Sequence, residues 1–463
     1  MKRYKRSLCW IRRDLRMNDH HSLSQAIDHS EEVAIVFVFD TTILGKLADK
    51  SDLRVNFIFE TLIQLDKELR NKGSRLILLY GDPKEWIPRV AEELGVEAVF
   101  ANEDYETLAI KRDQAVSAAL NKKGISFLSM KDQVIFSGKD VLKNDGSPYR
   151  VFTPYKKAWL KNFHRDCVKP YPVKFTKFIP LFELNELPIV RDISDIGFIP
   201  AKLPLPAGRD GADVMLSSFL KKIDRYHQTR DFPCQQGTSL LSVYLRFGVV
   251  SIRQVVKMAL EKRSSGSQMW LSELIWREFY QMILSEFSYV ETSAFLHDYS
   301  KIQWPGKKSH FHAWCEGRTG FPIVDAAMRN LNANGMMPNR CRMIVASFLV
   351  KDLLINWQWG ERYFAERLLD FDLSANNGGW QWAASTGCDA QPYFRVFNPW
   401  LQSQKFDPEG HYIKSWIPEL DGVPTKQLHS PILDHNEYPA PIVDHMEQKE
   451  RAINLFKESK GTK

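Results

Sequence analysis

The sequence of 463 residues predicts an α/β N-terminal domain with a Rossmann-like parallel sheet, joined by a long connector to an all-α domain. Three observations predict this fold class. Short apolar runs alternate with helical patterns early in the chain, prolines accumulate in the middle, and helical periodicity continues from about residue 208 onward. The predicted divisions are 1–131, 132–205 and 206–463.

Five apolar runs in the first region predict buried strands. They read SLCWIR, VAIVFVFD, RLILLYG, EAVFAN and ISFLSM, and helical patterns such as Asp52 to Lys72 separate them. This alternation favours a parallel sheet covered on both faces. Such sheets bind ligands at the carboxyl ends of their strands, here near Asp40, Gly81 and Asn102. No GxGxxG motif follows the first run, which argues against a nicotinamide dinucleotide site.

The middle region loses periodicity and gathers eight prolines: Pro148, Pro154, Pro170, Pro172, Pro180, Pro188, Pro200 and Pro204. A connector of this length without regular structure is uncommon, which suggests that it packs on both domains. In the helical region, PIVDAAMRNLNANG places Pro322 near a helix start and Gly335 just past its end. The next segment, PNRCRMIVASFLVKDLLINW, predicts a mostly apolar, buried helix.

The composition is that of a soluble globular protein, with 44% hydrophobic and 26% charged residues. No apolar run reaches membrane-spanning length, and the basic start MKRYKR lacks a signal-peptide core, so we expect a cytoplasmic protein. The six cysteines form no CxxC pair, so neither disulfides nor a metal site is expected. The net charge of +7 is compatible with a basic surface that faces phosphates, and equally with a mixed solvated surface.

The stretch DFDLSANNGGWQWAAS combines carboxylates, amides, a glycine pair and indoles. Asp370, Asp372 and Asn376 could hold a polar ligand, while Trp380 and Trp382 supply flat faces. A glycine pair among large rings lets the backbone approach a neighbour closely. The stretch therefore predicts a pocket for a large ring compound, with a buried helix start capped by Asn as the alternative.

Two other stretches place chemically active side chains on single helix faces. In WLSELIWREFYQMILSE, helical spacing groups Glu273, Trp276, Arg277 and Tyr280, and the alternative is an intrahelical pair of Glu273 with Arg277. Farther along the chain Asn339, Arg342 and Met343 share a face. Arg342 is a natural partner for Asp370 or Asp372, because a buried charge needs one.

The segment GTSLLSVYLRFG carries three hydroxyls behind a glycine, those of Thr238, Ser239 and Ser242. This composition suits phosphate binding at a helix terminus. It equally suits N-capping by Thr238 or Ser239, which the segment alone favours.

Together these motifs identify a family. The segments CWIRRDLRMND, GSPYRVFTPY, GTSLLSVYLRFG, WLSELIWREFY, FPIVDAAMRNLN, MPNRCRM, SFLVKDLLINW and ANNGGWQWAASTG run nearly end to end. The chain closely resembles the DNA photolyase and cryptochrome flavoproteins, most closely the bacterial class I photolyases that repair cyclobutane pyrimidine dimers. The resemblance implies FAD in the helical domain and an antenna pigment in the α/β domain.

The resemblance also implies roles for individual residues. The FAD contacts would be Tyr226, Thr238, Ser239, Ser242, Trp270, Arg277, Arg342, Asp370, Asp372 and Asn376, with Asn376 beside the reactive ring nitrogen. The lesion pocket would be Glu273, Trp276, Asn339, Met343 and Trp382, and the DNA phosphates would meet Arg230, Arg340 and Arg395. Trp380, Trp357 and Trp314 would relay electrons from the surface; without the family match they are three core tryptophans.

The function implied is light-dependent repair of cyclobutane dimers by electron transfer from excited, reduced FAD to a flipped-out lesion. Members that repair 6-4 photoproducts carry histidines where this chain has Asn339 and Met343, and DASH cryptochromes tend to carry tyrosine in place of Trp276 and Trp382. Duplex DNA damaged by ultraviolet light is the expected partner of a monomeric enzyme. The alternatives are a cryptochrome-like blue-light receptor without repair and a DNA-binding flavoprotein that has lost activity.

The antenna pigment is left open. Folate-using members have an Asn-Glu pair where this chain has Leu108 and Ala109, and a Cys-Lys pair that is absent near Tyr289 to Thr292. These departures put folate in doubt and leave a deazaflavin, a second flavin or no pigment.

Overall fold

The computed structural model describes residues 3–181 and 189–461, and the chain separates into two compact units. The first unit comprises 1–141, 159–221 and 239–263, and the second comprises 142–158, 222–238 and 264–463. The first therefore takes in part of the connector and helices from beyond residue 205.

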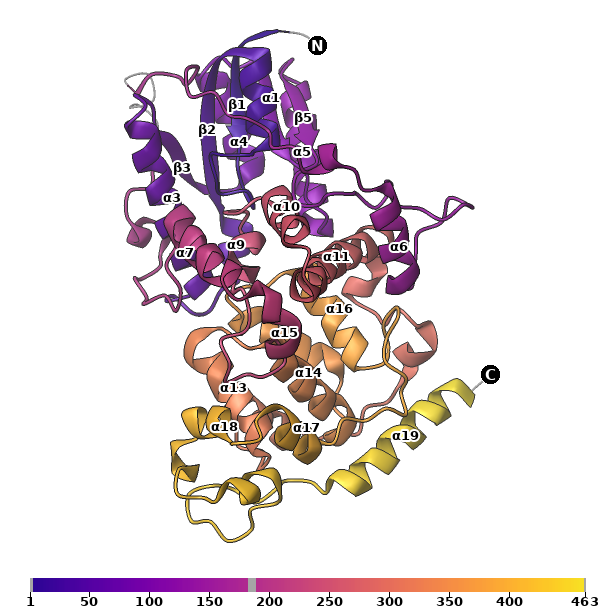
Figure 1. Cartoon of the computed structure of the whole chain (residues 1–463). Coiled ribbons are helices and arrows are strands. Elements are labelled where there is room, and N and C mark those ends of the chain that lie inside the picture. The colour runs from indigo at the N-terminus through magenta and orange to yellow at the C-terminus, as the bar shows by residue number, and fades with distance from the viewer. Residues whose placement is uncertain (1–2, 182–188, 462–463) are drawn as a thin grey trace. The chain divides into compact units, whose positions relative to one another are not determined.

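The first unit contains a five-stranded parallel sheet in the order β3-β2-β1-β4-β5 (Figure 1). The strands are β1 (Tyr4–Trp10), β2 (Ser30–Asp40), β3 (Leu76–Gly81), β4 (Ala98–Asn102) and β5 (Ser126–Met130). Its helices are α1 (His21–His29), α2 (Thr41–Leu44), α3 (Leu53–Arg70), α4 (Pro83–Glu93), α5 (Thr107–Asn121), α7 (Gly208–Leu220), α9 (Ser242–Arg246) and α10 (Ile252–Lys262). All five predicted strands are present, and the parallel sheet is confirmed.

The carboxyl ends of the strands lie where the apolar runs predicted them. β2 ends at Asp40, β3 at Gly81 and β4 at Asn102. The Asn102 side chain is engaged within the unit, since its amide nitrogen donates to Asp14 at 2.7 Å and its oxygen accepts from the Ser22 backbone at 3.0 Å. This part of the sheet edge is therefore held together by its own polar contacts.

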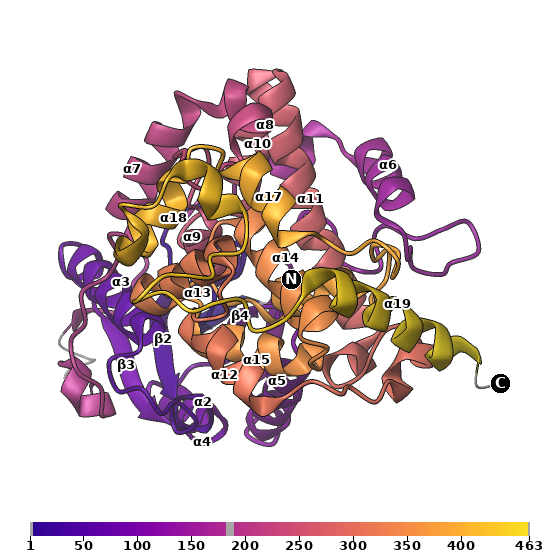
Figure 2. The ribbon, with the colours of Figure 1, turned by 90° about the horizontal axis from the view of Figure 1, so that it is seen from below.

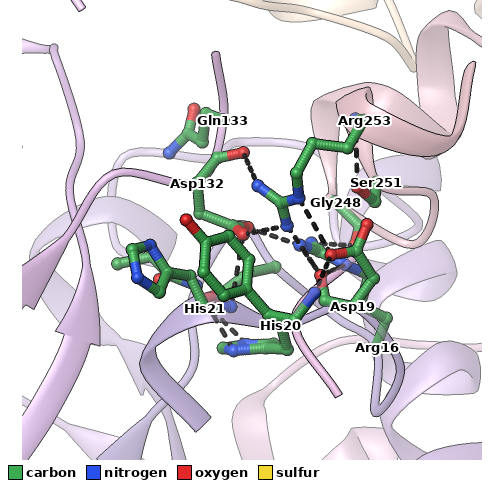
Figure 3. A network of polar contacts seen from close by, with 12 residues as sticks. Arg16, Asp19, His20, His21, Asp132, Gln133, Gly248, Ser251 and Arg253 are labelled. Carbon is green, nitrogen blue, oxygen red and sulfur yellow. Dashed lines mark hydrogen bonds and ion pairs between the residues drawn. The ribbon is translucent and has the colours of Figure 1, made fainter. Parts of the chain in front are cut away.

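A buried polar network fixes the connector onto the first unit (Figure 3). Asp132 accepts from Arg16 at 2.6 Å and from Arg253 of α10 at 2.7 Å, and Arg253 also donates to Asp19 at 2.8 Å. Although burial raises the pKa of the Asp132 carboxyl, the two guanidinium groups hold it well below its usual range. Farther along, the backbone of Ile179 donates to Val33 of β2 at 3.0 Å, so the connector also follows the sheet.

The second unit is helical among the residues described. It contains α8 (Tyr226–Thr229), α11 (Ser265–Glu286), α12 (Lys308–Glu316), α13 (Pro322–Asn334), α14 (Asn339–Ser347), α15 (Trp357–Arg367), α16 (Leu373–Ala383), α17 (Pro399–Phe406), α18 (His411–Trp416) and α19 (His445–Gly461). Helix α6 (Phe152–Asn162) crosses the division between the units. Helix α13 packs against α17 and α18 (Figure 2). As predicted, it has Pro322 in its first turn and ends at Gly335, whose φ of 68° suits glycine.

The prediction of one continuous helix through PNRCRMIVASFLVKDLLINW is wrong. Helix α14 ends at Ser347 and passes into a π-helical turn, η7 (Phe348–Asp352), and Leu354 has a φ of 54°. The Leu354 carbonyl accepts a hydrogen bond from the Gly306 backbone at 3.0 Å instead of continuing a helix. An apolar run cannot reveal such an interruption, because every residue of η7 is buried in either arrangement.

Candidate active site

Helix α11 presents the predicted face of polar and aromatic residues. Ser264 and Ser267 form a capping box that fixes its start. Leu271, Ile275 and Met282 are buried, whereas Glu273 and Trp276 are only half-buried. The helix therefore turns its apolar side to the core and leaves its chemically active side accessible.

Glu273 pairs with a residue that is distant in sequence. Its carboxylate accepts from Arg230 at 2.5 Å, whereas Arg277 donates to Gln281 at 3.4 Å. The Glu273 carboxylate therefore has a long-range partner in Arg230, which the intrahelical alternative with Arg277 did not include. Long-range pairs of this kind are invisible to helical spacing, which relates only residues three or four apart.

Two of the three arginines expected at DNA phosphates have carboxylate partners. Besides Glu273, Arg230 has Asp231 at 3.9 Å, and Arg340 lies 3.2 Å from the other oxygen of Asp231. Burial lowers the pKa of Arg230, but the hydrogen bond and charge of Glu273 raise it above its ordinary value overall. Arg395 is exposed. Arg230 and Arg340 are thus paired with carboxylates, whereas Arg395 is accessible from solvent.

Trp276 has one ring face already covered. Phe152 of α6 stacks on it with ring centroids 3.7 Å apart and planes at 10°, and Tyr280 lies 5.4 Å away at a tilted angle. The Phe152 backbone is held in turn by a hydrogen bond to Asp389 at 2.9 Å. The sequence reasoning missed Phe152, although the motif that contains it, GSPYRVFTPY, signals an aromatic segment.

Helix α14 brings together the predicted amide, cation and thioether. The Asn339 amide lies 3.7 Å from the Met343 sulfur. Arg342 donates to the two oxygens of Asp370 at 3.0 and 2.9 Å and to the Met337 carbonyl at 2.9 Å. The expected partnership of Arg342 is confirmed, with Asp370 rather than Asp372.

Helix α16 packs against α11, α14 and α15 and carries the stretch DFDLSANNGGWQWAAS. Its N-cap is Asp372, whose oxygen accepts from the Ala375 backbone at 3.2 Å. The alternative of a capped, buried helix start is thus correct as to the cap, but the capping residue is Asp and not Asn. Asn376 instead donates to the Glu361 carbonyl at 3.0 Å, and Asn377 donates to the Glu361 carboxyl at 3.1 Å.

The two glycines of α16 have different surroundings. A Cβ on Gly378 would lie 2.2 Å from the Tyr280 ring of α11, so this glycine lets the two helices approach closely. A Cβ on Gly379 would meet nothing within 4 Å. The predicted close approach is therefore made to the chain's own aromatic ring at Gly378, while Gly379 borders open space.

Glu361 accepts hydrogen bonds from Asn376 and Asn377, and the sequence did not single it out. Burial raises the pKa of its carboxyl to about 7, although the hydrogen bond from Asn377 lowers it. The segment WQWGERYF does not reveal that its glutamate is buried, because this burial depends on the packing of α15 against α16.

The tryptophans of the predicted relay are all buried, with exposures of 0% for Trp314, 3% for Trp357 and 2% for Trp380. The rings of Trp314 and Trp380 are 6.0 Å apart in an edge arrangement. Trp314 does not itself reach the surface. Phe311 lies 5.9 Å from Trp314 and 5.2 Å from Trp359, which is 38% exposed. Trp359 was missed by the sequence reasoning.

The hydroxyl segment divides between the units. Tyr226, which is buried, and Thr238 lie in the second unit, whereas Ser239 and Ser242 lie in the first. The Ser239 oxygen accepts from the Leu241 backbone at 3.3 Å, but α9 begins after Leu241 and no side chain caps it. The capping alternative for Thr238 or Ser239 is therefore wrong for this helix.

The second unit fits a large ring cofactor with polar atoms. The Trp380 indole nitrogen is buried and has no hydrogen-bond partner among the residues described, so a ligand atom would satisfy it. The paired Arg342 and Asp370 add charge. In the described part of the chain no group of three or more His, Cys, Asp or Glu side chains could hold a metal ion.

Comparisons with known proteins identify the family of the chain. The family model described as the FAD-binding domain of DNA photolyase matches residues 270–458, and the model described as DNA photolyase matches 7–174. Fold and site thus define a protein that binds a flavin nucleotide in its helical unit. The chain belongs to the DNA photolyase family.

Individual relatives match over nearly the whole chain. The deoxyribodipyrimidine photo-lyase of Vibrio cholerae is 40% identical over 98% of this chain and 100% of its own length. A class III photolyase from Agrobacterium tumefaciens has a TM-score of 0.90 at 31% identity, covering 100% of this chain and 99% of that one. An archaeal photolyase from Sulfolobus tokodaii, solved with two FAD molecules, has a TM-score of 0.86 at 34% identity, covering 98% and 100%.

Proposed function

We propose that this protein is a deoxyribodipyrimidine photolyase that repairs cyclobutane pyrimidine dimers in ultraviolet-damaged DNA. The observation that carries the proposal is the packing of α11 on α16, which places Glu273 and Trp276 on one helix and Trp382 on a direct neighbour. The family membership and the Vibrio cholerae relative support the same activity.

FAD is the cofactor that the helical unit would hold. Trp270, Arg277, Arg342, Asp370, Asp372 and Asn376 are the residues of this unit that we assign to it, with Tyr226 and Thr238 toward its phosphates. Excited by blue light in its reduced form, FAD supplies the electron that weakens the cyclobutane ring. The chain provides binding, orientation and exclusion of water.

The lesion must leave the duplex to reach this site, and the handling of the flipped bases falls to the chain's own side chains. Trp276 offers the ring face that Phe152 does not cover, and Trp382 offers a second indole for stacking. Stacking on such rings is worth about 1 to 3 kcal/mol per base. Glu273 would accept hydrogen bonds from the pyrimidine edges, and Asn339 would donate and accept them, with Met343 packed beside it.

Arg230, Arg340 and Arg395 would meet the DNA backbone. Because Arg230 and Arg340 are paired with Glu273 and Asp231, we assign the first encounter with phosphate to the exposed Arg395. We also assign Trp380, Trp357 and Trp314 to electron supply, with Trp359 as the exposed end of a branch through Trp314.

A second light-absorbing pigment is compatible with the family, and the archaeal relative was solved with two FAD molecules. In this chain the position of the folate-binding pair holds Leu108, which is 70% exposed, and the buried Ala109. Neither side chain supplies a polar group, so folate is disfavoured, and a deazaflavin or second flavin is the better candidate. We further propose that the protein acts as a monomer in the cytoplasm; no helix in the described ranges is long and apolar enough to span a membrane.

Illumination of the reduced, FAD-loaded protein with damaged duplex oligonucleotides tests the proposal. Loss of thymine dimers that requires both light and reduced FAD is the expected result. Binding of damaged DNA without light-dependent loss of dimers would instead favour the alternative, a cryptochrome-like photoreceptor.

A further inference from the structure

Lys351 is a fully buried lysine in η7 that has no place in the proposed chemistry. Its ammonium donates to the Ser385 hydroxyl at 3.0 Å and to the Tyr393 backbone carbonyl at 3.2 Å. These acceptors lie on the segment that leads from the end of α16 to α17. A buried lysine is costly unless its donors are satisfied, so these contacts define what the side chain holds.

The Tyr393 carbonyl belongs to a tight turn. The Arg395 backbone nitrogen donates to the Pro392 carbonyl at 2.9 Å, which makes Pro392 to Arg395 a four-residue turn with Tyr393 and Phe394 at its centre. In such a turn the orientation of the central peptide sets the backbone conformation of both central residues. Lys351 donates a hydrogen bond to the oxygen of that peptide.

An aromatic ring of α19 completes the site around the ammonium. Lys351 lies 3.8 Å from the ring centroid of Phe456, which is fully buried, and the Phe456 and Tyr393 rings are nearly parallel at 6.1 Å. A cation over an aromatic face is stabilised by the ring's charge distribution, and the effect grows when water is excluded. Phe456 therefore packs against both the Lys351 ammonium and the ring of Tyr393. The carbonyl of that tyrosine accepts a hydrogen bond from Lys351.

The other acceptor shows backbone strain. Ser385 has a φ of 62°, a left-handed conformation that glycine adopts more easily than serine. Strain of this kind marks positions where the side chain has a role. Here the serine hydroxyl accepts the hydrogen bond from Lys351, which a glycine would not provide.

Burial lowers the pKa of Lys351 to about 7, so its charge changes in the range where enzymes work. The neighbouring Asp352 of η7 and His445 of α19, the helix that carries Phe456, bond each other at 2.5 Å. Burial raises the pKa of Asp352 to about 6, against the influence of His445. Tyr393 contributes its carbonyl, and Ser385 does not ionise.

We propose that Lys351 is a positioning residue for DNA binding: by holding the Tyr393 carbonyl and the Ser385 hydroxyl, its ammonium fixes the turn that directs Arg395 at the DNA backbone. This inference rests on the proposed contact of Arg395 with phosphate. Loss of the charge removes the cation–π attraction to the ring of Phe456 and weakens the hydrogen bonds to the turn.

Binding of damaged duplex by the FAD-loaded protein in the dark, measured as a function of pH, tests the inference without altering a buried residue. Wild-type affinity should fall by about fivefold as the pH rises from about 6 to about 8.5, through the pKa of about 7. The Arg395→Ala protein should bind more weakly at every pH and lack this component, because its turn no longer carries a cation. The same pH dependence in both proteins would overturn the inference.

Two substitutions provide a second test. Ser385→Gly removes the hydroxyl while relieving the backbone strain, so it should weaken binding of DNA although its melting temperature is unchanged or higher. Lys351→Met should weaken binding and make Arg395→Ala nearly neutral in the double variant. Wild-type affinity in Ser385→Gly and Lys351→Met, with weak binding by Arg395→Ala, would overturn the role of Lys351. Wild-type affinity in Arg395→Ala would overturn the phosphate contact beneath it, while dimer repair remains a separate measurement.

Discussion

One face of the Trp276 ring is already packed against the protein before any ligand binds. Phe152 stacks on one face with ring centroids 3.7 Å apart, which holds the indole in place, and we propose that a base stacks on the other face. Ordering the ring in advance lowers the cost of binding. Residue-scale predictions therefore concern side chains whose surroundings are already fixed in the fold.

Trp276→Ala should weaken binding of DNA that contains a dimer by about 1 to 3 kcal/mol and leave binding of undamaged duplex nearly unchanged, because stacking requires the flipped lesion. Titration of both duplexes at one salt concentration measures this difference. Trp359→Ala, which removes a 38% exposed indole, is the matched control and should leave both affinities unchanged. Equal loss on both duplexes for Trp276→Ala would contradict its assignment to the lesion.

Glu361 should make stability depend on pH. Burial raises its folded-state pKa from 4.5 to about 7, so its contribution to stability is fully present below about pH 4.5 and is lost as the pH rises through about 7. Glu361→Gln keeps an oxygen for Asn377 and removes this cost. At pH 8 the variant should be more stable than the wild type, by on the order of 3 kcal/mol at most.

Denaturant unfolding of both proteins at about pH 5 and pH 8 measures the effect of Glu361→Gln. The difference in free energy of unfolding between the variant and the wild type should be smaller at about pH 5 than at about pH 8. A destabilised variant at pH 8 would show that the ionised carboxyl is needed where it lies.

Trp314→Phe should slow photoreduction of the oxidised flavin and leave repair by pre-reduced protein intact, because only the supply of electrons passes through the relay. The contact of Trp314 with Trp380 at 6.0 Å is the physical basis. Transient absorption measures the first effect and a dimer assay the second, with Trp416→Phe of α18 as a control for a tryptophan outside the set. A repair defect in the pre-reduced variant would argue against a relay role.

At the scale of elements, α16 contains two adjacent glycines with different surroundings. Gly378 meets Tyr280 of α11, whereas a side chain on Gly379 would enter open space. This difference allows a matched pair of substitutions one residue apart.

Gly378→Ala should destabilise the protein by about 1 to 3 kcal/mol, because its methyl group would overlap the Tyr280 ring and push the helices apart. Gly379→Ala should stabilise the cofactor-free protein by about 0.5 to 1 kcal/mol, since alanine favours a helix interior. Thermal unfolding of the two variants without FAD gives the comparison. Similar effects from both would mean that the close approach at Gly378 is not what spaces α11 and α16.

The helices and strands show which features of the fold local sequence patterns can predict. The five strands and the ends of α13 follow from periodicity, proline and glycine, which act over a few residues. Helix α14 was predicted too long, because the π-helical turn and the left-handed Leu354 depend on contacts with Gly306 from elsewhere in the chain. The division at residues 131 and 205 stays a prediction.

Some contacts of the candidate site were also predictable from the sequence, and others were not. The pairing of Arg342 with Asp370 was predictable because a buried charge needs a partner and few were available. The partner of Glu273 was not, because Arg230 lies 43 residues away. Phe152 and Glu361 were missed for the same reason, since each acquires its role from a distant neighbour.

For the whole molecule, the net charge of +7 is a weak guide to DNA binding. Arg230 and Arg340 are neutralised by nearby carboxylates, so the charge that a phosphate meets depends on individual arginines such as Arg395. Affinity should therefore respond to single substitutions in the second unit more than to total charge.

The most direct test of the central claim is a dimer-repair assay on duplex oligonucleotides with the reduced, FAD-loaded protein, in blue light and in the dark. We expect loss of cyclobutane dimers only in the light, and a rate that falls when Glu273 is changed to Gln, since we propose that the Glu273 carboxylate accepts hydrogen bonds from the pyrimidine edge. Damaged DNA that binds with Trp276-dependent affinity yet keeps its dimers under illumination would contradict the account.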